Sequence, residues 1–337
     1  MISIKNAGYE NLRTSLNNSL KELGGIEKFV SPGDKVLIKP NLCDPVKGAV
    51  TSPEVIKAVI ELVKEITPNV YVGDLPAVQE EDITSKVLNT TGINEILRET
   101  NTKFADPTKA KFIVQDIQNY KILEKTDFAQ VYFYVDTIIN LPKLKSHALT
   151  YITGAVKNLL GLIHMGERQY LHGFDDESFC HGLLDVYSFM KPKVKLNIMD
   201  AIDVMEGNKG PVHGDLTKTG KIIASDDAIE LDWAAAQLTG HDPEKILTNK
   251  LGVARGLGKP NTMQIEPIRF NRHINYVKKN KLVPFIDENC TLCGVCAKNC
   301  PANAIEMKEN KYVINDNCIK CYCCLESCPN NAINFEE

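Results

Sequence analysis

Cysteine is the residue type whose spacing most clearly indicates chemistry in this chain of 337 residues. Nine of its eleven cysteines fall within residues 290–329. They form two runs of three cysteines separated by two residues each, and three residues after each run comes a Cys-Pro pair. The first run is Cys290, Cys293, Cys296 and Cys300; the second is Cys318, Cys321, Cys324 and Cys328. The odd count and the crowding favour metal ligation over disulfide cross-linking.

The two runs are copies of one unit. FIDENC before the first run matches VINDNC before the second, and PANAI matches PNNAI behind them, at an offset of 28 residues. Three thiolates on one short curled loop can hold three irons of a four-iron cube, which leaves the fourth iron for a ligand from elsewhere. Zinc sites use paired Cys-x2-Cys knuckles and do not need such triplets.

Residues 281–337 therefore resemble a bacterial 2[4Fe-4S] ferredoxin. In that arrangement the fourth cysteine of each run serves the other cluster. The resemblance implies that one [4Fe-4S] cluster is held by Cys290, Cys293, Cys296 and Cys328, and the second by Cys318, Cys321, Cys324 and Cys300. Cys323 lies outside both patterns, and we interpret it as a small residue beside a cluster.

Residues 1–270, which precede the cysteine-rich block, alternate short apolar runs with longer helical patterns. Strands are predicted at KVLIKPNL, NVYVGDLP, DTIINLP, VKLNIMD and GKIIASDD, and helices at SPEVIKAVIELVKEI and DDAIELDWAAAQLTG, with Ser52 and Asp226 or Asp227 as caps. Alternating strands and helices predict an α/β fold with a mostly parallel sheet flanked by helices. Residues 101–136 are expected to form an antiparallel excursion. The predicted organisation is an α/β domain over 1–270, a linker over 271–284 and a small α+β two-cluster domain over 285–337.

Polar residues fall where several of these strands end. Lys39 and Asn41 end the first strand, and Asp74, Asn140 and Asp200 end later ones. Ligands of open α/β sheets bind in the crevice beyond the carboxyl ends of the strands. We therefore expect these side chains to converge on one site.

The segment INLPKLKSHALTYITGAVKNLLGLI, residues 139–163, has the highest density of such groups. It is expected to leave a strand at Pro142, to present Lys143, Lys145 and His147, and then to enter a helix with Lys157 and Asn158. Three lysines and a histidine indicate a cationic pocket for carboxylate or phosphate groups. The alternative is a solvated loop whose lysines only keep the surface soluble.

KPNLC, LPKLKSHALTYITGAVKNLLGLI, KPKVKLNIMDAIDVMEGN and IIASDDAIELDWAAAQLTG make residues 30–260 similar to the DUF362 family, whose members often carry a ferredoxin domain. The resemblance implies one site formed by Lys39, Asn41, Lys143, Lys145, His147, Lys157 and Asn158. The family's EGNGP loop is interrupted here by Lys209. His164, Arg168 and His172 could line the same pocket or bind a metal, although capping and packing roles are favoured for them.

Several classes of function find no support. The net charge of −4 indicates neither nucleic-acid nor membrane binding. We see no signal peptide and no apolar run of membrane-spanning length, so a cytoplasmic location is expected. Glycine-rich nucleotide fingerprints are absent, which leaves NAD, FAD and ATP without support, although a flavin bound without a motif stays open.

The sequence favours an iron–sulfur oxidoreductase. Electrons from a redox partner protein would pass through two [4Fe-4S] clusters to a small anionic substrate or cofactor in the α/β crevice. Substrate-binding roles are predicted for Lys39, Asn41, Lys143, Lys157, Asn158 and Asp200, and Lys145 or His147 would supply a proton. One alternative is an electron-transfer or maturation partner with no catalytic site. Another is a non-redox binding module with structural clusters. Oxygen-sensitive clusters suggest an anaerobic cytoplasm.

Overall fold

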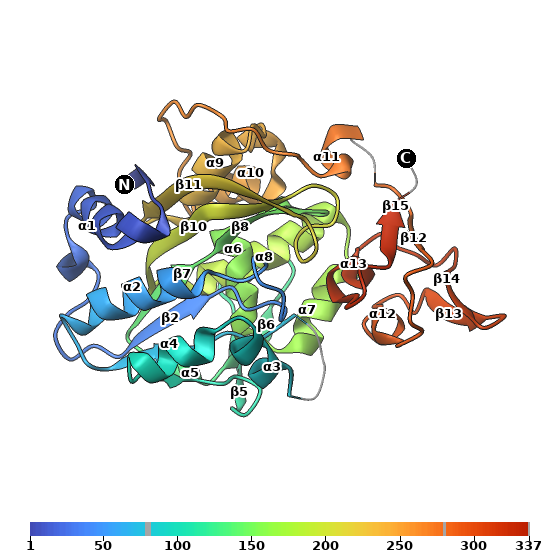
Figure 1. Cartoon of the computed structure of the whole chain (residues 1–337), viewed down its shortest axis with the longest axis horizontal. Coiled ribbons are helices and arrows are strands. Elements are labelled where there is room, and N and C mark those ends of the chain that lie inside the picture. The colour runs from blue at the N-terminus through green and yellow to red at the C-terminus, as the bar shows by residue number, and fades with distance from the viewer. Residues whose placement is uncertain (78–81, 279–280, 336–337) are drawn as a thin grey trace.

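A nine-stranded mixed sheet forms the centre of the protein in a computed structural model that describes residues 1–77, 82–278 and 281–335 (Figure 1). The strand order is β1-β11-β10-β7-β2-β3-β4, with β8 beside β10 and β9 beside β8. The strands are β1 Ile2–Asn6, β2 Val36–Pro40, β3 Val70–Val72, β4 Lys103–Phe104, β7 Thr137–Leu141, β8 Lys143–His147, β9 Tyr151–Thr153, β10 Val194–Glu206 and β11 Asp215–Ser225.

The middle of this sheet is parallel. β10 pairs in parallel with β7, β7 with β2, β2 with β3, and β3 with β4. Only β1, β11 and the β8–β9 hairpin add antiparallel pairs. The β2–β7 register places Lys39 opposite Asn140, so both side chains lie at the carboxyl edge. The prediction of a mostly parallel α/β sheet is confirmed.

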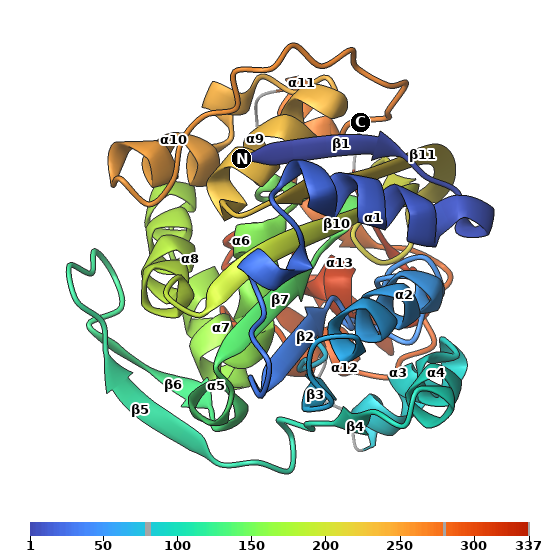
Figure 2. The ribbon, with the colours of Figure 1, turned by 90° about the vertical axis from the view of Figure 1, so that its left-hand side faces the viewer.

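Helices cover both faces of the sheet (Figure 2). One buried apolar cluster joins the sheet to α1, α2, α3 and α4, and another joins the opposite face to α5 through α9. These helices are α1 Leu12–Glu22, α2 Pro53–Lys64, α3 Ile83–Thr90, α4 Ile93–Glu99, α5 Val131–Tyr134, α6 Ala155–Asn158, α7 Met165–His172, α8 Asp176–Met190 and α9 Ala228–Leu238. The other helical elements described before the cysteine-rich region are α10 Leu247–Ala254, α11 Ile274–Lys278 and short 3-10 turns at Tyr9–Asn11, Ile26–Lys28, Leu159–Leu162 and Pro243–Lys245.

The two predicted helices are α2 and α9. Asp227 caps α9, because its Oδ1 accepts hydrogen bonds from the main chain of Ile229 and Glu230 at 2.9 and 3.1 Å. Ser52 stands at the N-terminus of α2 but makes no side-chain cap. The expected antiparallel excursion is the hairpin of β5 Phe112–Asp116 and β6 Lys125–Ala129.

The alternative of a solvated loop after Pro142 is wrong. The chain continues as β8, and every residue from Lys143 to His147 is buried. Lys143 can be buried because its Nζ lies 2.9 Å from Oδ2 of Asp200, on the neighbouring strand β10. The main-chain N–H and the hydroxyl of Ser52 donate to the same oxygen at 2.8 and 2.6 Å, which is why Ser52 does not cap α2. This group locks β8, β10 and α2 together.

The cysteine-rich region forms a small unit beside the sheet domain, drawn in red in Figure 1. Its elements are β12 Pro284–Ile286, α12 Val295–Lys298, β13 Ile305–Lys308, β14 Lys311–Ile314, α13 Cys323–Ser327 and β15 Ile333–Phe335. β12 pairs with β15 and β13 with β14, so each sheet contains one strand from each copy of the sequence repeat. Part of the predicted linker 271–284, residues 279–280, lies outside the described residues.

None of the helices in the described ranges is both long enough and apolar enough to cross a membrane.

We expect Lys143→Met to lower the free energy of unfolding by about 3–5 kcal/mol, because it leaves the buried Asp200 carboxylate without its cation. Lys57→Met is the matched control: the Lys57 Nζ pairs with Glu99 at 2.7 Å on the surface, where water screens the pair and its loss changes the free energy of unfolding little. Anaerobic urea unfolding followed by far-UV circular dichroism measures both. Equal losses in the two variants would contradict a structural role for the buried pair.

Candidate functional site

The eight patterned cysteines line two hollows in the small unit. The first hollow is lined by Cys290, Cys293, Cys296 and Cys328, and the second by Cys318, Cys321, Cys324 and Cys300. Each hollow thus combines three cysteines of one run with the last cysteine of the other run. This is the exchange of ligands that the ferredoxin resemblance implies.

Left-handed backbone conformations curl the two ligand loops. Leu292 and Gly294 have φ of 61° and 75°, and their equivalents in the second copy, Lys320 and Tyr322, have φ of 55° and 61°. Such conformations favour glycine and strain other residue types, so three such non-glycine positions indicate that the loop shape is held by its surroundings. The shape brings three sulfurs of one run to the same hollow.

The hollows fit four-iron clusters. Main-chain N–H groups of Ala304 and Ala332 donate to Sγ of Cys300 and Cys328 at 3.2 and 3.3 Å, a contact that stabilises thiolate sulfur in clusters. Across residues 1–77, 82–278 and 281–335 no three His, Cys, Asp or Glu side chains converge as ligands of a metal ion would. A cube places each cysteine on a different iron, so its ligands stand wider apart than those of one zinc ion.

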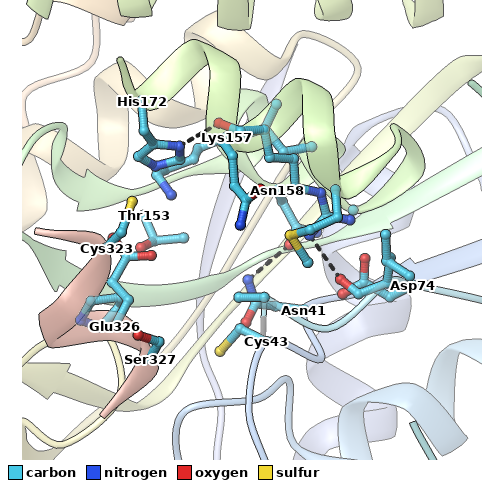
Figure 3. Close-up of a pocket in the computed structure, with 18 of the residues that line it drawn as sticks. Asn41, Cys43, Asp74, Thr153, Lys157, Asn158, His172, Cys323, Glu326 and Ser327 are labelled. Carbon is cyan, nitrogen blue, oxygen red and sulfur yellow. Dashed lines mark hydrogen bonds between the residues drawn. The ribbon is translucent and has the colours of Figure 1, made fainter. Parts of the chain in front are cut away.

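A pocket lies between the sheet domain and the small unit (Figure 3). It encloses about 820 Å³, open solvent at its mouth included. Cys323, Glu326 and Ser327 of α13 face Lys157, Asn158 and His172 across it. Cys323 also lines the second cysteine hollow, together with Cys321. The pocket and the second ligand set are therefore adjacent.

Four of the eight residues predicted for the α/β site line this pocket: Asn41, Lys145, Lys157 and Asn158. Lys39 does not line the pocket but contacts Asp74, which does. In the same way His147 contacts Glu326, which lines the pocket. Lys143 and Asp200 pair with each other and are not among the lining residues. The pocket therefore brings together only half of the residues that the sequence predicted for one site in the crevice.

Lys145 is solvated by the protein itself. Its Nζ donates to Ala49 O at 2.7 Å and Asn41 Oδ1 at 3.1 Å, and lies 3.2 Å from Cys43 Sγ. Burial raises the pKa of the Cys43 thiol, although the Lys145 charge opposes this. Among the described residues Lys145 has no carboxylate within ion-pair distance, so its charge is left to act on the pocket.

A chain of amide side chains fixes the floor of the pocket. Asn41 donates to Asn158 Oδ1 at 3.0 Å, Asn158 donates to Asn140 Oδ1 at 2.8 Å, and Asn140 donates to Asn197 Oδ1 at 2.9 Å. The turn of α6 that carries Lys157 and Asn158 is capped from α9 by Asp232, whose carboxylate accepts from the main chain of α6. Burial raises the pKa of Asp232 to about 7.

Lys39 is fully buried and its Nζ lies 2.6 Å from Oδ1 of Asp74, which does line the pocket. Burial lowers the pKa of Lys39, against the pull of Asp74. The pair lies directly against Gly161, where a Cβ would come within 1.6 Å of Asp74 Oδ1. Only glycine fits at this position, and Lys39 acts by holding Asp74 in place.

His147 is buried behind the pocket. Its Nδ1 accepts main-chain hydrogen bonds from Leu149 and Thr150 at 3.0 and 3.3 Å, so the proton is on Nε2. Nε2 lies 2.8 Å from Oε1 of Glu326, outside hydrogen-bond alignment. Burial, with help from Lys157, lowers the pKa of His147 to about 4, so the ring is neutral at neutral pH.

Glu326 connects the two parts of the protein electrostatically. Burial alone would raise the pKa of its carboxyl, but Lys157 and His147 outweigh burial and hold that pKa below its usual range. His147, predicted to be catalytic, does not line the pocket, whereas Glu326 does. Sequence reasoning missed Glu326 because it stands inside a cysteine run, 179 positions from its histidine partner.

Arg168 and His172 also line the pocket, which the sequence allowed as an alternative to the capping and packing roles that it favoured. Of the three residues interpreted in that way, only His164 acts as a cap: its Nδ1 accepts from Gly166 N at 3.1 Å at the start of α7. The sequence signal that favours the pocket for Arg168 and His172 is their spacing of four residues on one helix, which places both side chains on one face.

Lys209 attaches the small unit to the sheet domain. Its Nζ donates to Ile333 O and Asn331 O at 2.6 and 3.2 Å. His213 Nε2 lies 2.8 Å from the carbonyl oxygen of Cys328, one of the exchanged ligands. The lysine that interrupts the glycine loop thus has a structural role at the boundary between the two parts.

Comparison with known sequences gives two family matches. Residues 36–237 match a domain of unknown function, DUF362, and residues 283–329 match the 4Fe-4S dicluster domain. A thylakoid-associated protein of Synechocystis sp. is 34% identical over 254 residues, which are 73% of this chain and 76% of that protein. A ferredoxin-like protein in the nif region of Sinorhizobium fredii is 59% identical over 29 residues, 9% of this chain and 45% of that protein.

Among solved structures, the lactate racemase apoprotein from Thermoanaerobacterium thermosaccharolyticum shares 13% identity with a TM-score of 0.42. The match covers 67% of this chain and 54% of that one, so it spans about half of the racemase. Its activity says nothing about this chain at that level of likeness. The sequence matches are decisive: the chain belongs to the DUF362 family and carries a 4Fe-4S dicluster ferredoxin domain at residues 283–329.

Proposed function

We propose that this protein is an iron–sulfur oxidoreductase that binds two [4Fe-4S] clusters and delivers electrons to a small anionic substrate or cofactor in the pocket. The observation that carries the proposal is the position of Cys323, which lines both the second cysteine hollow and the pocket. The clusters would supply single electrons at low potential. The chain's own residues would bind the acceptor beside them.

The pocket lining supports an anionic ligand. Lys145 and Lys157 bring positive charge from β8 and α6, and Asn41 and Asn158 offer amide groups in fixed orientations. Lys145 faces the pocket and is the proposed proton donor, while His147 acts through Glu326 as a positioning residue. Lys143 and Asp200 are left out of the proposed binding site because they neutralise each other within the fold.

Electrons would enter from a redox partner protein at the first hollow. Cys293 is exposed, whereas Cys296 and Cys328 of the same hollow are buried. The neighbouring Leu292 is 40% exposed and offers an apolar contact at this edge. We further propose an anaerobic, cytoplasmic setting, since clusters of this kind are sensitive to oxygen.

We expect the reconstituted protein to contain about eight irons per chain, from two four-iron clusters. Cys328→Ser should lower the iron content and change the electron paramagnetic resonance signal of the reduced protein, because it removes an exchanged ligand. Cys323→Ser should leave the iron content unchanged and is the matched control. A loss of iron in Cys323→Ser, with none in Cys328→Ser, would refute the ligand assignment.

Electron delivery is tested with the anaerobically reconstituted protein, reduced with dithionite and freed of excess reductant. A panel of small carboxylate and phosphate compounds is added, and reoxidation of the clusters is followed by visible absorbance. We expect at least one compound to accelerate reoxidation and Lys157→Ala to slow it by about tenfold or more, because a charged hydrogen bond is lost. Lys308→Ala, on exposed β13, should change nothing.

The same experiment separates the alternatives. If Lys157→Ala and Lys145→Ala leave reoxidation by every compound unchanged while the clusters still exchange electrons with a ferredoxin, the protein is an electron carrier without a site of its own. If the clusters cannot be reduced reversibly, they are structural and the proposal fails.

A further inference from the structure

The guanidinium of Arg168 is held in the pocket wall with one nitrogen left over. Arg168 is 8% exposed, and Nη1 donates to the carbonyl oxygens of Leu75 and Pro76 at 3.1 and 3.2 Å. Nε donates to Ile163 O at 3.3 Å. Nη2 is buried and has no hydrogen-bond partner among the residues that the structure describes. Three neutral acceptors orient this cation, and its remaining donor is left unsatisfied in the wall of the pocket.

Burial lowers the pKa of Arg168 to about 10, with the nearby Asp74 opposing the shift, so the side chain is charged at neutral pH. A buried charged donor without a partner is costly, by more than the usual contribution of a hydrogen bond. A ligand oxygen with negative charge would remove that cost. The donor set therefore indicates an anion at this wall of the pocket.

His172, one helical turn further along α7, has the opposite need. Its Nδ1 lies 2.6 Å from Arg168 O, and because a carbonyl only accepts, Nδ1 carries the proton. Burial lowers the pKa of His172, which leaves the ring neutral and Nε2 as a bare acceptor. Within the described part of the chain Nε2 has no partner. A ligand that satisfies it must bring a hydrogen-bond donor.

The charges around the pocket restrict that donor. Glu326 favours a positive group near His172, whereas Lys157 and Arg168 both disfavour one. A neutral hydroxyl group is not repelled by Lys157 or Arg168. Asp74 and Glu326 also line the pocket, so a dianion such as a phosphate monoester would face two carboxylates, while a single carboxylate carries less charge toward them.

We propose that Arg168 and His172 form the recognition subsite of this pocket, and that its ligand is a small carboxylic acid bearing a hydroxyl group. The carboxylate accepts from Nη2 of Arg168, and the hydroxyl donates to Nε2 of His172. The inference rests on the proposed function in taking this pocket as the ligand site, and it adds the chemical class of the ligand.

The test uses the anaerobically reconstituted full chain and four probes of matched size: glycolate, acetate, glycine and inorganic phosphate. Proton and phosphorus NMR titrations give their dissociation constants. We expect glycolate to bind about tenfold more tightly than acetate, because glycolate can pair with both Arg168 Nη2 and His172 Nε2, whereas acetate can pair only with Arg168. Glycine and phosphate should bind more weakly than glycolate.

Two variants assign the roles of the two side chains. Arg168→Lys should weaken glycolate and acetate alike by about tenfold or more, since lysine cannot hold the three carbonyl contacts and a free donor together. His172→Phe should leave acetate unchanged and abolish the preference for glycolate. Arg255→Gln is the control for general destabilisation: Arg255 is a partly buried arginine, paired with Asp185 at 2.6 Å, outside this pocket.

Equal binding of glycolate and acetate to the wild-type protein would overturn the proposal, and so would tighter binding of phosphate or glycine. If Arg168→Lys does not fold, His172→Phe still decides, because retention of the glycolate preference in that variant refutes the subsite. Broadening of the glycolate methylene resonance on cluster reduction provides an independent readout of proximity to the clusters.

Failure of the subsite and failure of electron delivery give different results. Glycolate binding that depends on Arg168 and His172, without reoxidation of the clusters by any compound, would uphold the subsite and refute the proposed function. Reoxidation by a compound of the panel, with glycolate binding unaffected by both variants, would uphold the proposed function and refute the subsite.

Discussion

Three lysine ammonium groups lie out of water at the carboxyl edge of the sheet, and the polar structure around them follows from the need to solvate those charges. Lys39 and Lys143 have buried carboxylates, Asp74 and Asp200, at 2.6 and 2.9 Å. Lys145 instead has a main-chain carbonyl and an amide oxygen. An unpaired buried charge would cost several kcal/mol, so these partners determine where the strands and α2 must meet.

The different partners separate structure from function at this edge. A cationic side chain paired with a carboxylate has little electrostatic effect on its surroundings, whereas one whose hydrogen-bond acceptors are uncharged has a larger effect. Lys145 and Arg168 belong to the second kind, and both line the pocket. Together with Lys157 of α6, these two groups give the pocket its cationic character, and Asp74 and Glu326 limit it.

The parts of the protein that the sequence predicts are those encoded locally. The two cysteine runs, the strands β2, β7, β10 and β11, and the Asp227 cap depend on spacing within a few residues. The burial of β8 could not be read in this way, because a strand with two lysines and a histidine has a polar pattern. Its partners are distant in the sequence: Asp200 lies 57 residues after Lys143, and Asn41 and Ala49 lie 104 and 96 residues before Lys145. The role of Arg168 could not be chosen between pocket and packing for the same reason: its acceptors come from the segment after β3 and from the turn before α7.

The attachment of the small unit uses main-chain atoms as acceptors. Lys209 and His213 contact carbonyl oxygens of Asn331, Ile333 and Cys328, and Asn275 of the connecting segment donates to Ala148 O at 3.2 Å. A carbonyl is present whatever side chain its residue carries, so these bonds make no direct use of the side chains of the ferredoxin unit. The ferredoxin unit can therefore change its surface side chains, and with them its choice of redox partner, while the alignment of its second hollow with the pocket is preserved.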